Sequence, residues 1–225
     1  MKLRTMLLSL MWLGSSLAQA EGELMVMPAT LKVYNNHEHS VNVKNLGDAP
    51  LYLSISLQKV MNPGESPEIK QPLSALTHPG ILANPDKLTL GPGQSRAISL
   101  KSLVEPEAET LYRLYIVPVR SMQVEEAPED KITAPMSVAI GYGVLVRHMP
   151  PPGKQHSSWT HRCKDGGVTL ENTGNVSVQL SEFEGAGIKQ AKSKLALFPG
   201  TPQHFSTPRL KFVIDNKMQT LECSK

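Results

Sequence analysis

Apolar and polar residues alternate with a period of two along much of this chain, whereas the period of an amphipathic helix is almost absent. The clearest alternation spans residues 51–57, and residues 111–119 and 136–146 are the richest strand candidates. Successive side chains of a strand point to opposite faces of a sheet. The pattern therefore predicts an all-β protein built from short, half-buried strands.

Segments rich in proline, glycine and asparagine separate these strands, as in a β-sandwich. The sharpest break is Pro150-Pro151-Pro152-Gly153. Three prolines remove three backbone donors, which excludes a central strand and suits a linker. We therefore expect two sandwich domains, an N-terminal one over residues 21–149 and a C-terminal one over 150–225.

The first twenty residues have the plan of a secretory signal peptide. Lys2 and Arg4 give a positive start, residues 6–13 are apolar, and Ala18-Gln19-Ala20 is a small-residue cleavage site. The apolar run is shorter than the ~20 residues that span a bilayer, so a membrane anchor is the weaker interpretation. Glu21 would follow the cut, and no cysteine stands there to carry a lipid. We expect export to the periplasm without membrane insertion.

Charge gives little support for a nucleic-acid partner. The chain has 23 Lys and Arg and 20 Asp and Glu, and removal of residues 1–20 takes away two of the basic residues and none of the acidic ones. The exported chain would then carry 21 − 20 = +1, and no stripe dense in Lys and Arg is present. Nucleic-acid binding is therefore not expected.

The two cysteines, Cys163 and Cys223, both lie in the expected C-terminal domain. In an oxidising compartment such a pair usually forms a disulfide, which is our expectation; the alternative is two separate buried thiols. Closing a loop of this length removes chain entropy worth roughly 4 kcal/mol. The spacing excludes redox chemistry of the CxxC type.

The sequence carries no catalytic signature: GxSxG, HExxH and P-loop patterns are all absent. His37 and His39 could place two imidazoles on one side of a strand, but no third ligand is evident. The segment 35–39 is better interpreted as a polar turn between strands. We expect neither an enzyme nor a metal site.

Several segments, in their order and spacing, resemble the periplasmic chaperones of the chaperone–usher pathway, in particular the alternate class that serves colonisation-factor-type fimbriae. The resemblance covers nearly the whole exported chain. It is carried by residues 25–28 (MVMP), 61–65 (MNPGE), 81–100 (ILANPDKLTLGPGQSRAISL), 109–115 (ETLYRLY), 136–150 and 172–175 (NTGN).

The resemblance implies two Ig-like β-sandwich domains joined by a proline-rich hinge in a boomerang shape. It implies a chaperone that caps fimbrial subunits (pilins) by donor-strand complementation and delivers them to an outer-membrane usher, with no cofactor and no ATP. The donor side chains would be Met136, Val138, Ile140 and Tyr142, which period two places on one face. The alternative is that this face packs only into the chaperone's own core.

Chaperones of this family also bind the pilin's C-terminal carboxylate, through an Arg in the first strand and a Lys near the end of the last strand of domain one. The first position falls here on Leu31, beside Lys32, and the second falls within residues 144–147, which contain no Lys. Our candidates for the anchor are, in order, Arg113, Arg147 and Lys32. Arg147 could instead form an interdomain ion pair with Glu109.

Two rival functions belong to other classes. The chain could itself be a fimbrial structural subunit or minor pilin, although pilins usually have one domain and an N-terminal donor extension. A secreted enzyme built on sandwiches is the second rival, and the motif search does not support it.

Overall fold

The computed structural model describes residues 23–119, 140–185 and 194–223, which form seventeen strands and two short 3-10 helices. The predicted all-β class is confirmed. The expected signal peptide (1–20) and the expected donor residues Met136 and Val138 lie outside the described residues. Within the described ranges, no helix is long and apolar enough to cross a membrane.

Strands β1 to β10 form two facing sheets. One sheet has the order β1-β3-β8-β6, and the other has the order β2-β10-β9-β4-β5, with β7 also pairing with β4. The strand bounds are β1 Leu24–Met27, β2 Thr30–Val33, β3 His39–Asn45, β4 Leu51–Val60, β5 Lys70–Pro72, β6 Ile81–Asn84, β7 Lys87–Leu90, β8 Ser95–Ser102, β9 Thr110–Val119 and β10 Tyr142–His148, with a 3-10 helix at Leu73–Ala75 after β5.

Strands β11 to β17 form a second pair of sheets, with the orders β11-β12-β15 and β14-β13-β16-β17. Their bounds are β11 Trp159–Lys164, β12 Gly167–Asn172, β13 Val178–Glu184, β14 Lys194–Leu197, β15 Gln203–Phe205, β16 Arg209–Ile214 and β17 Lys217–Glu222. Each of the four sheets draws its strands from one side of the Pro150–Gly153 segment. We propose that each pair of sheets is one domain, with the boundary at residues 149 and 150 as predicted.

The two cores follow from the alternating pattern of the sequence. In β4, Leu51, Leu53, Ile55 and Leu57 are all buried while the residues between them are exposed. Their side chains meet apolar residues of β3, β8, β9 and β10 between the sheets. A separate apolar cluster around Phe212 fills the C-terminal domain. Burial of one face of each strand therefore stabilises two independent sandwiches.

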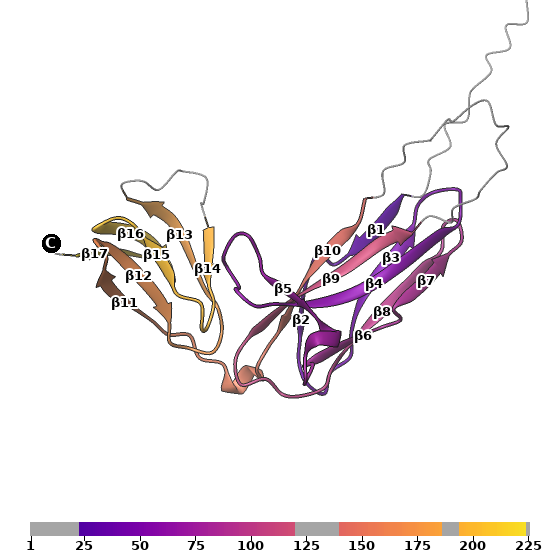
Figure 1. Ribbon diagram of the computed structural model, residues 1–225, viewed down its shortest axis with the longest axis horizontal. Coiled ribbons are helices and arrows are strands. Elements are labelled where there is room, and N and C mark those ends of the chain that lie inside the picture. The colour runs from indigo at the N-terminus through magenta and orange to yellow at the C-terminus, as the bar shows by residue number, and fades with distance from the viewer. Residues whose placement is uncertain (1–22, 120–139, 186–193, 224–225) are drawn as a thin grey trace, which may run out of the picture.

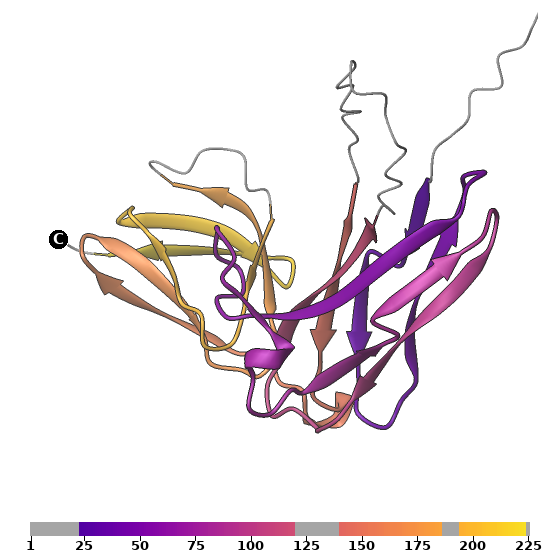
Figure 2. The ribbon, with the colours of Figure 1, turned by 45° about the vertical axis from the view of Figure 1, so that its right-hand side comes forward.

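The proline-rich segment joins the two domains, and residues Pro152–Lys154 form a 3-10 helix within it. Figure 1 shows two lobes that diverge from this segment, as the boomerang shape requires, and Figure 2 shows the same arrangement after rotation. The loop between β4 and β5 extends from the N-terminal domain toward β14 in the first view. The two lobes therefore face one another across a surface to which both contribute.

The expected disulfide between Cys163 and Cys223 is present. Cys163 lies in β11 and Cys223 follows β17, so the bond joins the two different sheets of the C-terminal domain. A covalent link between sheets supports a domain that is too small to bury a large core.

Candidate functional site

One face of the sheet β2-β10-β9-β4 carries a row of residues that starts basic and ends apolar. Lys32 in β2 pairs with Arg147 in β10, Arg147 pairs with Leu111 in β9, and Leu111 pairs with Val60 in β4. Cross-strand partners share a face of the sheet. The opposite face carries the buried core residues, so this row lies on the outer surface of the sandwich.

The apolar end of this row contacts the C-terminal domain. Val60 and Leu111 form a buried cluster with Phe198, and Leu145 and Ala196 pack against it. Phe198 and Ala196 come from the C-terminal domain, so the outer face of the sheet is the surface that looks toward the second lobe. The two domains are thus in contact through a small apolar cluster at one end of the row, and the basic residues Lys32 and Arg147 lie at its other end.

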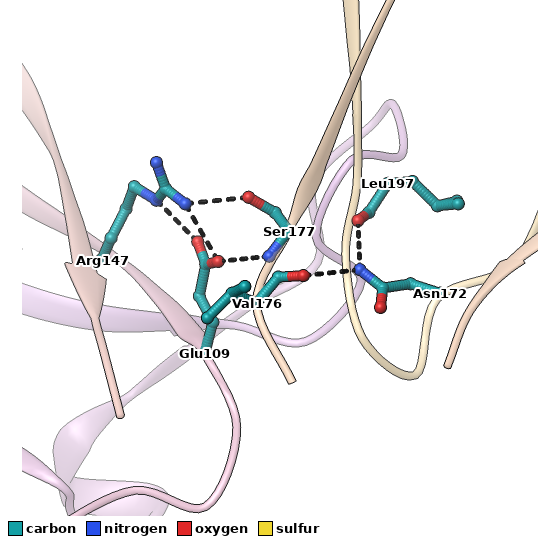
Figure 3. Close-up of polar contacts among 6 residues, drawn as sticks. All are labelled: Glu109, Arg147, Asn172, Val176, Ser177 and Leu197. Atoms are coloured by element: carbon teal, nitrogen blue, oxygen red, sulfur yellow. Dashed lines mark hydrogen bonds and ion pairs between the residues drawn. The ribbon is translucent and has the colours of Figure 1, made fainter. Parts of the chain in front are cut away.

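Glu109 and Arg147 join the two domains at the basic end (Figure 3). Arg147 donates from Nε to Glu109 Oε1 at 2.6 Å and from Nη2 to Glu109 Oε2 at 3.0 Å, and Nη2 also donates to Ser177 Oγ at 2.8 Å. The backbone N–H of Ser177 donates to Glu109 Oε2 at 2.7 Å. The Glu109 side chain is completely buried. A buried carboxylate with this set of donors is fully paired, so it holds Ser177 of the second domain against the first.

Arg113, the first anchor candidate, has a carboxylate partner within the chain. It lies one row further along the face and donates from Nε to Glu68 Oε2 at 3.1 Å and from Nη2 to Glu68 Oε1 at 2.6 Å. The hydrogen bonds from Arg113 hold the pKa of the Glu68 carboxyl below its usual range, and the same bonds raise the pKa of Arg113. Lys70 adds a cation 3.9 Å from Glu68 Oε2 and lies over the Tyr115 ring. A ligand carboxylate would have to replace Glu68 to gain the same two donors.

Lys32, the third anchor candidate, is exposed and directly in register with Arg147. Among the described residues, no carboxylate forms an ion pair with it. Neighbouring strands lie ~4.8 Å apart, so Lys32 and Arg147 are adjacent cations on one surface. Of the three basic candidates, Lys32 is the one without an acidic partner in the part of the chain that the structure describes.

The start of β10 has an open edge. Strand β2 pairs with β10 only from Leu145 onward, whereas β9 pairs with it from Tyr142. Across residues 142–144, no described strand lies on the side opposite β9. Leu145 donates its N–H to the Ala29 carbonyl on the β2 side at 3.0 Å, so period two turns the N–H of Gly143 toward the same open edge. The backbone N–H and carbonyl of Gly143 therefore have no partner strand among the described residues and can pair with an added strand.

The two expected donor residues that the structure describes are exposed beside this edge. Ile140 is 72% exposed and Tyr142 is 39% exposed. They have the same parity as Val144 and Val146, which are buried in the core of the N-terminal domain. The predicted donor face and the core face are thus one continuous face of β10, buried from Val144 onward and exposed before it.

The other face of this strand end carries the two glycines that the sequence places there. A Cβ on Gly141 would lie 3.1 Å from Val117 Cγ2, and a Cβ on Gly143 would lie 3.4 Å from Tyr115 Cε1. Side chains of β9 therefore occupy the space over β10. Val117 is exposed, and so are Val119 and Tyr52, which pair with one another across β9 and β4. An apolar surface thus continues from the open edge along the sheet.

Of the two histidines considered as metal ligands, His37 lies in the connection between β2 and β3, and His39 is the first residue of β3. Residues 35 and 36 form the turn between β2 and β3, as expected for a polar segment, with Asn36 at a φ of 61°. His39 Nε2 accepts a hydrogen bond from the Tyr34 N–H at 2.9 Å, and His37 Nδ1 lies 2.9 Å from the Asn35 carbonyl. No cluster of three potential ligands occurs in the described ranges.

The sequence patterns missed two residues of this surface. Glu68 comes from the loop before β5, 45 residues from Arg113, and no periodicity connects the two. Ser177 follows a turn of the second domain and meets Glu109 across the hinge. The one usable signal was the demand of a charged Arg113 for a partner within an apolar strand.

Comparisons with known proteins agree with the geometry. No protein-family model matches the chain. A CFA/I fimbrial protein of Escherichia coli, named as a subunit of those fimbriae, is 27% identical over 165 residues, which cover 73% of this chain and 68% of that protein. A CS1 fimbrial protein of the same organism, also named as a subunit, is 25% identical over 166 residues, which cover 72% of this chain and 68% of that protein.

Solved structures share the two-domain fold. The class 5 fimbriae chaperone CfaA superposes with a TM-score of 0.67 at 20% sequence identity, covering 90% of this chain and 100% of that chain. The CsuC–CsuE chaperone–tip subunit complex of archaic Csu pili from Acinetobacter baumannii matches with a TM-score of 0.58 at 14% identity, covering 89% of this chain and 98% of that chain. The predicted resemblance to the chaperones of chaperone–usher pili is therefore confirmed at the level of the fold.

Proposed function

We propose that this chain is a periplasmic chaperone that binds fimbrial subunits and supplies them with a strand. The observation that carries the proposal is the open edge of β10 at residues 142–144, with Ile140 and Tyr142 exposed beside it. A free strand edge next to exposed apolar side chains is the arrangement that β-augmentation uses. The expected donor residues Met136 and Val138 would extend the same pattern.

The parity of β10 supports this role. Its core-facing side chains and its exposed donor candidates lie on one face of the strand. A strand that continues from one sandwich into the edge of another keeps its alternation, so the same face would enter the subunit's apolar groove. Backbone hydrogen bonds would come from the edge and specificity from the side chains. We propose that the complex is then delivered to an outer-membrane usher, without catalysis or a cofactor.

For the subunit's C-terminal carboxylate, we propose an anchor formed by Lys32 with Arg147. Lys32 has no acidic partner among the described residues, and Arg147 uses Nε and Nη2 on Glu109, which fixes its guanidinium beside Lys32. Arg113, which the sequence favoured, is held by Glu68 in the same way, but its cross-strand partner in β10 is Leu145 and not a cation. A carboxylate between Lys32 and Arg147 would also lie near the contact between the domains.

Single variants separate these anchors. Lys32→Ala should reduce recovery of a co-expressed fimbrial subunit by more than about tenfold, because removal of one partner from a charge pair costs about 2 kcal/mol or more. Arg113→Ala, with its own partner Glu68, serves as the comparison, and both proteins should keep a cooperative melt. If Arg113→Ala abolishes recovery and Lys32→Ala does not, Arg113 is the anchor.

A fimbrial structural subunit is the second candidate, because the relative with 27% identity carries the name of a fimbrial subunit. The two-domain fold favours a chaperone. Co-expression of this chain with a fimbrial subunit, followed by purification from the periplasm, tests the difference. A one-to-one complex supports the chaperone, whereas polymers of this chain alone would support the structural subunit.

A further inference from the structure

One side chain of the turn between β12 and β13, that of Asn175, contacts both the N-terminal domain and the hinge. Asn175 donates from Nδ2 to the carbonyl of Glu107 at 3.1 Å and to the carbonyl of Lys154 at 2.9 Å. Its Oδ1 accepts from the N–H of His156 at 2.8 Å. Glu107 precedes β9 in the N-terminal domain, and Lys154 and His156 lie on the hinge side of β11. One amide thus joins three segments that are far apart in sequence.

The backbone of Asn175 is engaged in the same way. Its N–H donates to the His156 carbonyl at 3.0 Å, and its carbonyl accepts from the N–H of Glu109 at 2.8 Å. Glu109 is the buried acid that also binds Arg147 and Ser177. All three N–H donors of Asn175 and both of its oxygen acceptors are therefore bonded to groups outside its own turn.

The turn also packs tightly against the hinge segment. A Cβ on Gly174 would lie 2.5 Å from the His156 carbonyl oxygen and 2.6 Å from the Ser158 backbone nitrogen. Backbone atoms cannot give way like a flexible side chain, so glycine is required at this close approach. The turn consequently has little freedom to shift relative to the chain that leaves the hinge.

The second asparagine of the turn has a different role. Asn172 donates from Nδ2 to the carbonyls of Val176 at 2.8 Å and Leu197 at 2.7 Å, both within the C-terminal domain (Figure 3). Its Oδ1 accepts from the N–H of Gly174. Asn172 therefore folds the turn, whereas Asn175 extends from the turn to the neighbouring segments.

We propose that Asn175 is a positioning residue that fixes the angle between the two domains and so places the C-terminal domain opposite Lys32 and Arg147. Asparagine suits the position because it offers two N–H donors and one acceptor on a short side chain. Aspartate would keep the acceptor and lose both donors, and alanine would lose all three bonds. The placement of the C-terminal domain opposite Lys32 and Arg147, as part of subunit binding, rests on the proposed function; the role of Asn175 in the interdomain angle does not.

Distance measurements test the angle without any partner. Spin labels would be introduced as non-canonical amino acids at Lys101 and Lys217, which are exposed in different domains, so that the disulfide stays intact. Asn175→Ala should broaden the distance distribution to about twice the wild-type width, since three side-chain hydrogen bonds are lost at one joint. Asn175→Asp should act in the same direction and serves if the alanine variant folds poorly.

Thr173→Ala is the matched control. Thr173 lies in the same turn, but its hydroxyl donates to Ser158 Oγ and does not reach the N-terminal domain. This variant should keep the wild-type distance distribution. An unchanged distribution in both Asn175 variants would overturn the proposal.

Recovery of a co-expressed fimbrial subunit tests whether the angle that Asn175 fixes matters for subunit binding. Asn175→Ala should lower recovery at least about fivefold relative to Thr173→Ala, the factor that corresponds to ~1 kcal/mol. A broad distribution with unchanged recovery would overturn the positioning role. If the wild-type chain itself captures no subunit, the proposed function fails, while the distance data still decide the role of Asn175 in the interdomain angle.

Discussion

His148, the last residue of β10, has a completely buried imidazole, one nitrogen of which has no hydrogen-bond partner among the described residues. Its Nε2 lies 2.8 Å from Ser102 Oγ, and that hydroxyl donates its single hydrogen to the Val104 carbonyl. Nε2 must therefore carry the proton of the neutral ring, and Nδ1 has no partner among the described residues. Burial lowers the pKa of His148 from 6.5 to about 4.

This pKa predicts that acid destabilises the N-terminal domain. The folded state disfavours the protonated ring, so between about pH 6.5 and 4 the unfolded chain binds more protons, and stability falls as the pH falls. From pH 7 to pH 5, His148 should lower the free energy of unfolding by about 2 kcal/mol. Urea unfolding at the two pH values measures this difference.

The matched variant is His148→Gln, which keeps a donor for Ser102 and does not titrate. Its pH-dependent loss between pH 7 and 5 should be smaller than that of the wild type by the same amount. Glu68, whose pKa is lowered from 4.5, contributes in the same direction only at lower pH. Equal losses in the two proteins would contradict the assignment.

The ion-pair and hydrogen-bond partners of single side chains were the least predictable part of the site. The sequence predicted that Arg113 needs a carboxylate, but the pairing with Glu68 depends on how β5 folds back beside β4. The pair Cys163 and Cys223 was predictable, because only two cysteines are present and both lie in one domain. Long-range contacts of a single polar group leave no periodic signal in a sequence.

At the scale of elements, alternation predicted most strands and said little about their neighbours. Leu51 to Leu57 gives both the existence of β4 and its buried face. Of the strand expected over 136–146, residues 136–139 lie outside the described residues, and β10 runs from Tyr142 to His148 because its pairing with β9 and β2 continues past Val146. The parallel partner β2 was not predicted, since it is brought beside β10 only by the fold. That partner matters because β2 begins only at Thr30, opposite Leu145, and this start defines the open edge.

Ile140 tests the role of the strand end. Ile140→Asp should leave both domains folded, because the side chain is 72% exposed, yet should abolish subunit capture, since an unpaired charge cannot enter an apolar groove. Co-purification with a co-expressed subunit and a thermal melt measure the two effects. Met218→Asp, at an exposed apolar residue of β17, is the matched control and should capture normally. Loss of the fold in Ile140→Asp would show that the residue belongs to the core.

For the whole molecule, the disulfide should determine the stability of the C-terminal domain. Cys163 and Cys223 are separated by 60 residues. Replacing both with serine should lower the free energy of unfolding of that domain by roughly 4 kcal/mol through restored chain entropy. Denaturant unfolding checks this value, and mass spectrometry of unreduced protein checks the bond. Two freely alkylated thiols in periplasmic protein would contradict the expectation.

The overall architecture was predictable to the extent that it follows from local pattern. Alternation and turn residues indicated sandwiches, and Pro150–Gly153 indicated where they divide. The contact between the domains was less accessible, because it depends on Glu109, Ser177 and Asn175 meeting from segments that share no period. This contact holds the two lobes together. The open edge of β10 belongs to the same sheet whose outer face makes the contact.

The backbone N–H of Gly143 tests the central claim most directly. In the free chain this N–H faces the open edge, so its hydrogen should exchange rapidly with solvent, unlike that of Leu145, which is bonded to Ala29. In a purified complex with a fimbrial subunit, an added strand should accept the Gly143 N–H, and its exchange should slow by at least about a hundredfold. Exchange followed by NMR on labelled chain, with Leu145 as the internal reference, gives both rates. A stable complex in which the Gly143 N–H still exchanges as rapidly as in the free chain would contradict strand donation.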